Sequence, residues 1–206
     1  AKTLGLTEEY GRYSPELMAA QAGKFGLLKE NGLNYAYHID ATRYGRYLRQ
    51  LAESHGARRI EGKVVQVDQA DQGDIRSLRL DDGQIVEGDF FIDCSGFAGL
   101  LIDKTLHTDY QDWSHWLPCD RAVAVQTQSV SPPIPYTRSI AQESGWQWRI
   151  PLQSRVGNGL VFSSEYLSDD EATHRLLDGV EGDTLIEPRV IPFRTGQRHR
   201  HWSKNC

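Results

Sequence analysis

The chain contains 206 residues, of which 39% are hydrophobic and 25% charged, a composition typical of a folded globular protein rather than a disordered or fibrous one. Its 23 basic and 28 acidic residues give a formal net charge of −5, so no overall positive field favours nucleic acid or an anionic membrane as a partner. The apolar runs are far too short for a membrane span, and three widely spaced cysteines favour a reducing, cytoplasmic environment over a disulfide-bonded one.

Two helices are predicted in the first quarter of the chain. Ser14-Pro15 begins a short one that runs through Ala20, because serine caps helices well and proline suits their first turn. A longer one follows the N-cap residue Asp40 and ends near Gly56. Its apolar residues recur at helical spacing, which predicts an amphipathic helix. They are Tyr44, Tyr47, Leu48, Leu51 and Ala52.

Short alternating runs follow and predict a small antiparallel meander, with Asp82-Gly83 as one tight turn. Residues 89–94 are a nearly continuous apolar run closed by Ser95-Gly96, which is typical of a strand buried on both faces. We expect a helix to begin near Gly99. Helix, meander and buried strand in this order indicate the second half of a Rossmann-like dinucleotide-binding domain. The expected meander strands are 63–67, 75–80 and 84–86.

The second half of the chain is rich in Trp, Pro and short alternating runs, which predict a mostly antiparallel sheet with one helix at residues 169–177. Gly157-Asn158-Gly159 is interpreted as the turn between the last two strands. We therefore expect an α/β protein with two partial domains, residues 1–105 and 106–206. The expected strands are 122–125, 136–142, 146–152 and 160–163.

The ends of the chain suggest an internal part of a longer protein. The chain starts at Ala1, its single methionine is Met18, and no helix stop or polar tail precedes Cys206. This expectation limits what the residues alone predict about function.

Several kinds of site are disfavoured by the motifs. Neither a G-x-S-x-G elbow nor a phosphate-binding glycine-rich loop is present, which argues against a serine hydrolase and against pyrophosphate binding by those routes. His199 and His201 share a face of any strand but have arginine neighbours and no further ligand, so no metal site is predicted. The basic residues near the end favour a solvated edge; they are Arg194, Arg198, Arg200 and Lys204.

Trp146 and Trp148 are two residues apart in a predicted strand, so both indoles point to one face while Gln147 and Arg149 point to the other. Such a pair forms a continuous aromatic wall, which can line a cofactor channel or an aromatic-substrate pocket. Because tryptophan usually buries its large surface, the residues alone favour core packing over that function.

Five motifs, in order along the chain, resemble the flavin-dependent tryptophan halogenases. The W-x-W-x-I-P element is the most specific, because it distinguishes the halogenases from flavin monooxygenases of similar fold. The motifs are residues 35–41 (YAYHIDA), 91–101 (FIDCSGFAGLL), 113–120 (WSHWLPCD), 146–151 (WQWRIP) and 157–164 (GNGLVFSS).

The resemblance implies an enzyme that takes reduced FAD from a separate reductase and uses oxygen to oxidise chloride or bromide to hypohalous acid. This oxidant then reaches a distant tryptophan or another electron-rich aromatic substrate. Trp146 and Trp148 would lie near the flavin and block the substrate from approaching it, so that the enzyme halogenates and does not hydroxylate. Residues 1–105 would then be part of an FAD-binding domain, and residues 106–206 part of a substrate-side domain.

The resemblance also implies cofactor contacts. The backbone of Val64 and Val65 would bind the adenine, and the turn at Asp93, Ser95 and Gly96 would lie against FAD, with glycine allowing close backbone approach. For Asp93 the residues leave an alternative open, a turn-forming carboxylate that accepts hydrogen bonds from nearby N–H groups.

Parts of the family pattern are missing. The glycine-rich loop, the catalytic lysine and the catalytic glutamate of the family lie outside this chain, and Lys2 stands in no matching motif. We therefore expect the chain alone to be inactive and to bind FAD weakly or not at all. Two alternatives remain: a flavin monooxygenase that hydroxylates its substrate, and a non-catalytic binding module.

Overall fold

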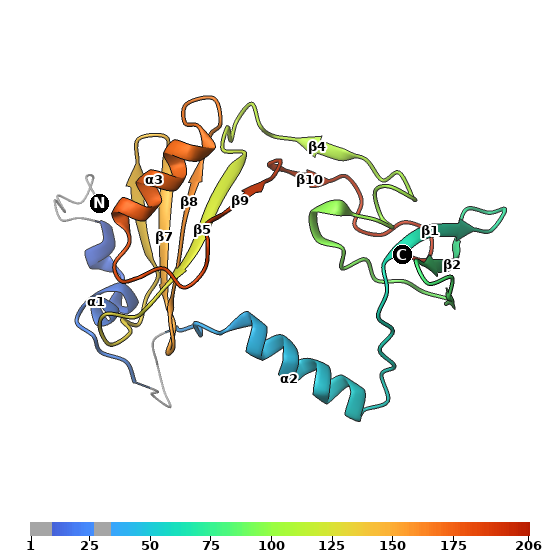
Figure 1. Cartoon of the computed structure of the whole chain (residues 1–206), viewed down its shortest axis with the longest axis horizontal. Coiled ribbons are helices and arrows are strands. Elements are labelled where there is room, and N and C mark those ends of the chain that lie inside the picture. Colours follow the sequence, from blue (N-terminus) through green and yellow to red (C-terminus); the bar gives the residue numbers. More distant parts are fainter. Residues whose placement is uncertain (1–9, 27–33) are drawn as a thin grey trace. The chain divides into compact units, whose positions relative to one another are not determined.

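The computed structural model describes residues 10–26 and 34–206 and divides the chain into two compact units (Figure 1). The five-strand unit comprises the residues up to Gly45 together with Cys119–Pro192, and the meander unit comprises Arg46–Pro118 together with Phe193–Cys206. Each unit combines two segments, so this division differs from the expected boundary at residue 105. The functional assignment of residues 1–105 and 106–206 stays a prediction. Lys2 lies outside the described residues.

The five-strand unit contains one antiparallel sheet with the strand order β6-β7-β8-β5-β9, which confirms the antiparallel sheet expected in this half of the chain. Helix α3 (Asp169–Gly179) lies along one face of that sheet (Figure 1). A short helical segment precedes the sheet, with η2 at Tyr10–Tyr13 and α1 at Pro15–Gln21. The strands are β5 (Arg121–Thr127), β6 (Arg138–Gln142), β7 (Gly145–Pro151), β8 (Val156–Phe162) and β9 (Arg189–Pro192).

The core of this unit lies between α3 and the sheet. Ser168 and Glu171 form a reciprocal capping box that starts α3, the helix expected at residues 169–177. Leu176 packs from α3 onto Phe162 and its neighbours, which are fully buried. The cluster contains Val123, Val125, Leu160, Phe162, Leu167, Ala172 and Leu176.

The expected turn at Gly157-Asn158-Gly159 is wrong, because β8 runs through all three residues. The chain turns earlier, where the N–H of Leu152 donates to the carbonyl of Arg155 at 2.8 Å. Asn158 remains in the strand because its buried amide donates to the Thr127 hydroxyl of β5 at 3.0 Å. Gly157 and Gly159 are therefore strand residues, although a glycine-rich segment of this kind is typical of a turn.

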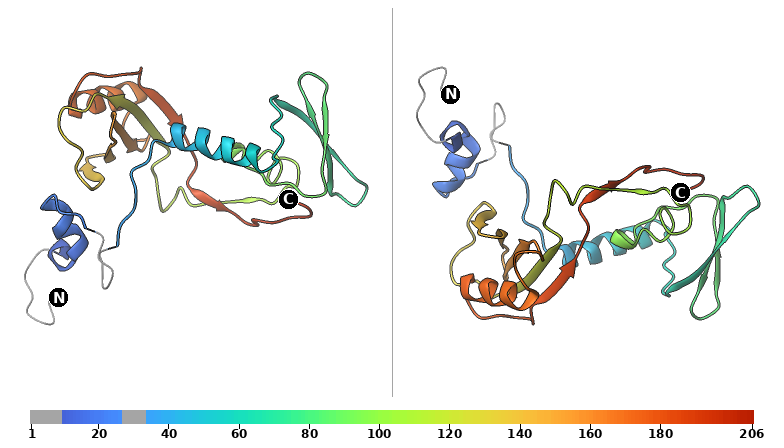
Figure 2. Two further views of the ribbon diagram at one scale, coloured as in Figure 1. Left: turned by 90° about the horizontal axis from the view of Figure 1, so that it is seen from below. Right: turned by 90° about the horizontal axis from the view of Figure 1, so that it is seen from above.

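The meander unit contains the expected antiparallel meander, with the strand order β1-β2-β3, and β1 and β2 form a long hairpin (Figure 2). A second, two-stranded sheet pairs β4 with β10. The core of this unit is made by Ile75, Phe91, Leu101, Ile102 and Cys206. The strands are β1 (Val64–Gln69), β2 (Ile75–Leu80), β3 (Ile85–Glu87), β4 (Tyr110–Asp112) and β10 (Gly196–Arg198).

Helix α2 (Ala41–Ser54) confirms the amphipathic helix predicted after Asp40, and it contains the division between the two units. The backbone N–H groups of Thr42 and Arg43 donate to Asp40 Oδ1 at 3.1 and 3.2 Å, so Asp40 is its N-cap. Its apolar side chains are exposed, and none of its residues is buried.

The buried strand expected at residues 89–94 is wrong. No strand forms there, and Phe90 and Ile92 are 53% and 79% exposed while Phe91 alone joins the core. The N–H of Phe91 donates to the carbonyl of Asn205 at 2.9 Å, and none of the described strands pairs with this segment. An apolar run without a neighbouring strand remains extended coil. The helix expected near Gly99 is a 3₁₀ turn, η3 (Gly96–Ala98), followed by further turns.

Candidate functional site

Trp146 and Trp148 lie on the face of the five-strand sheet that α3 does not cover. The strand alternation places Gln147 and Arg149 on the α3 face, where they are only 4% and 8% exposed, whereas Trp146 is 42% exposed. The predicted sharing of one face is confirmed. The core packing that tryptophan alone favours is not seen for Trp146 in this chain, where both of its polar neighbours on β7 are buried instead.

Polar partners allow Gln147 and Arg149 to be buried on the α3 face. Arg149 Nη2 lies 2.7 Å from Glu181 Oε2, and Gln142 Nε2 donates to Gln147 Oε1 at 3.5 Å. A buried charge that is paired avoids most of the cost of an unpaired one. The α3 face therefore accepts the two polar side chains of β7, and the tryptophans take the open face.

The two indoles are neighbours, with ring centroids 6.0 Å apart and planes inclined by 55°. Opposite them on β8 lie Val161, paired with Trp146, and Gly159, paired with Trp148. These contacts make a continuous aromatic surface, which we call the tryptophan wall and define as Trp146 and Trp148. Its partners on β8 are smaller than the indoles, so the rings are not enclosed from that side.

His38 holds the carboxyl end of β7. Its Nδ1 lies 3.0 Å from the carbonyl of Pro151, which can only accept, so Nδ1 carries the hydrogen. Its Nε2 lies 3.1 Å from the hydroxyl of Thr137. Two motifs that carry the resemblance, YAYHIDA and WQWRIP, therefore meet in space at the contact between His38 and Pro151. A second contact between motifs joins Asp120 to Ser164, whose hydroxyl donates to Asp120 Oδ2 at 2.6 Å.

A hollow of about 650 Å³ opens at this end of β7. Its lining includes Pro151 together with the rings of Phe25, Tyr35 and Tyr37, which contact one another edge to face with successive centroids 5.3 and 5.6 Å apart. Glu16 and Lys24 add one carboxylate and one ammonium group. This volume and its partly aromatic lining fall in the range of small-molecule sites.

Asp40 joins helix α2 to the β7–β8 turn as well as capping the helix. Its Oδ2 forms an ion pair with Nη1 of Arg155. The hydrogen bond from Arg155, with that from the N–H of Arg43, lowers the pKa of Asp40 from 3.8 to about 2. A carboxyl with a depressed pKa stabilises the fold fully above its unfolded pKa, and that contribution is lost as the pH falls through the folded value.

We predict that Asp40→Ala lowers the melting temperature of the protein more than Asp40→Asn, because asparagine can still cap α2 but cannot pair with Arg155. The difference between wild type and Asp40→Asn should be constant above about pH 4 and should shrink between pH 3.8 and about 2. Thermal unfolding across this pH range measures both effects. Equal melting temperatures for the two variants at neutral pH would contradict the capping role.

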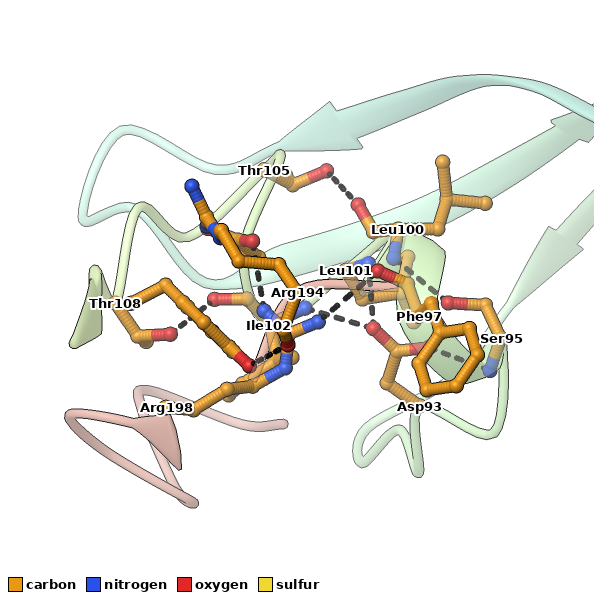
Figure 3. Close-up of polar contacts among 12 residues, drawn as sticks. Asp93, Ser95, Phe97, Leu100, Leu101, Ile102, Thr105, Thr108, Arg194 and Arg198 are labelled. Atoms are coloured by element: carbon orange, nitrogen blue, oxygen red, sulfur yellow. Dashed lines mark hydrogen bonds and ion pairs between the residues drawn. The ribbon is translucent and has the colours of Figure 1, made fainter. Parts of the chain in front are cut away.

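In the meander unit, the carboxylate of Asp93 organises the turn that follows it (Figure 3). Asp93 Oδ1 accepts from the N–H of Ser95 at 2.9 Å, and Oδ2 accepts from those of Leu101 and Ile102 at 2.8 and 2.9 Å. The hydroxyl of Ser95 in turn accepts from the N–H of Leu100 at 2.7 Å. The turn-forming alternative for Asp93 is therefore the one that the contacts support.

The charge of Asp93 strengthens this arrangement. Burial by itself raises the pKa of Asp93, but the hydrogen bonds from Ser95, Ile102 and Leu101 outweigh it and hold the pKa below its usual value. The carboxylate therefore stays ionised near neutral pH, and its stabilising contribution is lost only in acid, as the pH falls through that lowered pKa.

We predict that Asp93→Ala destabilises the protein by about 2 kcal/mol, because three backbone N–H groups lose their acceptor. Asp93→Asn should cost less, since its carbonyl can still accept. Urea unfolding and FAD titration of the complete protein measure stability and cofactor affinity separately. Unchanged stability with much weaker FAD binding would instead assign the carboxylate to the cofactor.

Val64 and Val65 lie at the edge of the meander, because β1 is its outer strand and, among the residues that the structure describes, pairs only with β2. A register shift between Val64 and Gln66 leaves Val65 out of the ladder, so its backbone groups are not consumed by β2. Both valines line a hollow of about 340 Å³, whose other walls include Leu100, Lys104 and His107.

These features fit a flat ring system bound by main-chain groups. Gly96 adds a second open position, since its φ of +66° is left-handed and a Cβ there would meet no atom within 4 Å. The sequence did not indicate Lys104 and His107, because nothing in their local pattern shows that the loop after Gly99 returns to β1.

The remaining sequence-derived candidates are accounted for by contacts within the meander unit. Arg198 Nη1 lies 2.7 Å from Asp103 Oδ2, and the guanidinium of Arg194 lies 4.4 Å from the ring centroid of Tyr110. Arg194 and Arg198 therefore have structural partners. No cluster of three potential metal ligands occurs among the described residues, His199 and His201 included.

No helix within residues 10–26 and 34–206 has the length and apolarity needed to cross a membrane.

Comparison with known proteins identifies the family. A model of the tryptophan halogenase family matches residues 1–206. The chain belongs to the tryptophan halogenase family, and the resemblance inferred from its motifs is confirmed.

The relatives include both curated enzymes and solved structures. The tryptophan 6-halogenase ThaL of Streptomyces albogriseolus is 39% identical over 194 residues, which cover 91% of this chain and 36% of ThaL. The flavin-dependent halogenase Xcc4156 of Xanthomonas campestris has a TM-score of 0.93 and 50% identity over all of this chain and 42% of its own. BrvH of Brevundimonas sp. BAL3, another flavin-dependent halogenase, has a TM-score of 0.92 and 44% identity. The chain therefore spans less than half the length of each of these relatives, from 36% of ThaL to 44% of BrvH.

Proposed function

We propose that this chain is part of a flavin-dependent halogenase that chlorinates or brominates tryptophan or another electron-rich aromatic molecule. The observation that carries the proposal is the match of the family model to residues 1–206, which include the W-x-W-x-I-P element with both indoles on one face of β7. On β7, Gln147 and Arg149 are buried on the α3 face, whereas Trp146 is exposed and Trp148 is partly buried on the other face.

We assign the FAD contacts to the meander unit. The free backbone at Val64 and Val65 would hold the adenine, and Gly96 would let the main chain approach the cofactor closely. Asp93 and Ser95 would act indirectly on FAD binding, because their side chains accept hydrogen bonds from backbone N–H groups and so fix the conformation of the turn. This unit would be the second half of a Rossmann-like FAD-binding domain. When bound, reduced FAD supplies, with oxygen, the oxidising power that converts the halide to hypohalous acid.

The five-strand unit would act on the substrate side. The tryptophan wall would exclude the organic substrate from the flavin and leave passage only for a small oxidant, which favours halogenation over hydroxylation. The hollow at the end of β7 supports an aromatic substrate, since the rings of Phe25, Tyr35 and Tyr37 line it. The proposed activity therefore separates oxidant formation from substitution on the aromatic ring.

The proposal requires parts that this chain does not supply. A separate flavin reductase would deliver reduced FAD, and the family's glycine-rich loop, catalytic lysine and catalytic glutamate match no position among these 206 residues. We therefore expect the chain alone to be inactive and the complete enzyme to act in the cytoplasm.

The test uses the complete enzyme with a flavin reductase, FAD, NADH, oxygen and tryptophan, with and without chloride. We expect a chlorinated product only when chloride is present. A hydroxylated product that forms equally in both conditions would favour a flavin monooxygenase instead. No turnover and no FAD binding would favour the non-catalytic binding module.

A further inference from the structure

The indole of Trp148 occupies the space that a side chain at position 159 would fill. The β7–β8 register pairs Trp148 directly with Gly159. A Cβ built on Gly159 would fall on Cζ2 and Cη2 of the indole, closer than two carbon atoms can approach. Gly159 is itself buried beneath this ring. The indole therefore packs directly against the backbone of β8, and only a glycine at position 159 leaves room for it. We call this packing of Trp148 on Gly159 the seat.

The other glycines of the hairpin behave differently. A Cβ at Gly145 would collide with the backbone of Val161, so Gly145 serves the chain path itself. A Cβ at Gly157 would meet only the carbonyl of Ile150 at 3.8 Å, which is an ordinary contact. Gly157 and Gly159 are two residues apart and share one face of β8. Of the three, Gly159 alone is required by an aromatic side chain.

Small residues continue along the same row of the sheet. Ser139 on β6 pairs with Trp148, and Ala124 on β5 pairs with Gly159. Glycine inside a strand weakens the strand, and it often marks a close approach by another group. Gly159 lies in the middle of β8 despite this cost, and the residues at the two ends of the row, Ser139 and Ala124, are also small. The arrangement sets how far the indole projects from the sheet.

We propose that Gly159 is a positioning residue for the halogenation reaction, because it seats Trp148 and so fixes the shape of the tryptophan wall. The proposal rests on the proposed function for its catalytic consequence, but not for the seat itself. A methyl group at position 159 lifts the indole away from β8 and changes its angle to Trp146. Under the proposed function, the displaced indole would change how well the wall separates the organic substrate from the flavin.

The experiment compares Gly159→Ala with its matched control, Gly157→Ala, in the complete enzyme. The two indoles are close enough to give an exciton-coupled circular dichroism band. We expect this band to change in Gly159→Ala and not in Gly157→Ala. We also expect halogenated product per flavin oxidised to fall about tenfold in Gly159→Ala, since displacements of about 1 Å at reacting groups have effects of this order or larger.

A rescue variant separates the seat from a general loss of stability. Gly159→Ala should lower the melting temperature by several degrees, and adding Trp148→Phe should restore much of this loss, because the smaller ring leaves room for the methyl group. An unchanged band in Gly159→Ala, or no restoration by Trp148→Phe, overturns the seat. A changed band with unchanged product per flavin oxidised overturns the positioning role. A wild-type enzyme that does not halogenate contradicts the proposed function alone, because the band and the rescue need no turnover.

Discussion

Replacing Trp148 by alanine in the complete enzyme is expected to lower the rate of halogenation at least about tenfold while leaving FAD affinity nearly unchanged. The same is expected for Trp146→Ala. Both side chains lie on the open face of the five-strand sheet, and neither is among the residues to which we assign FAD contacts in the meander unit. Product formation under saturating reduced FAD and a separate FAD titration measure the two quantities.

Trp202→Ala provides the matched control for this prediction. Trp202 is also exposed, at 68%, but it belongs to the meander unit and lies outside the tryptophan wall. We expect its loss to leave halogenation close to that of wild type. If Trp148→Ala instead lost FAD affinity and kept its halogenation per bound flavin, the assignment of the wall would be refuted.

The second large effect concerns the core beneath α3. Phe162 is fully buried between α3 and the sheet and belongs to the main cluster of that unit. Replacing it by alanine leaves a cavity that the close-packed neighbours fill only in part, so we expect a loss of about 3–5 kcal/mol in unfolding free energy. The urea midpoint of the complete protein measures this loss.

Leu177→Ala is the control for the core prediction. Leu177 follows Leu176 on α3 but is 37% exposed, so its truncation should cost less than about 1 kcal/mol. A Phe162→Ala variant with a loss as small as this would show that α3 contributes little to the stability of the sheet.

The elements that the sequence predicts correctly are those with a clear local pattern. The helix after Asp40 has both a cap and a helical apolar period, and the meander has alternation with a tight turn. The strand expected at residues 89–94 has only an apolar run, which does not show whether a partner strand exists. Phe90 and Ile92 are exposed for that reason.

The candidate site was predictable in its residue types but not in their surroundings. Alternation in β7 places Trp146 and Trp148 on one face, yet whether that face is buried depends on α3, which is distant in the sequence. Gly159 was misread as part of a turn, because a glycine under an indole and a glycine in a turn have the same local sequence. For Asp93, the two open interpretations differ only in hydrogen-bond partners, which require coordinates.

The most direct test of the account is the identity of the product made from tryptophan by the complete wild-type enzyme and by a Trp146→Ala/Trp148→Ala double variant, assayed side by side with chloride, reductase and FAD. We expect chlorotryptophan from the wild type, and from the variant a large loss of chlorination with oxygenated product appearing in its place. Chlorination by the double variant at the wild-type level would contradict the claim that this wall makes the protein a halogenase.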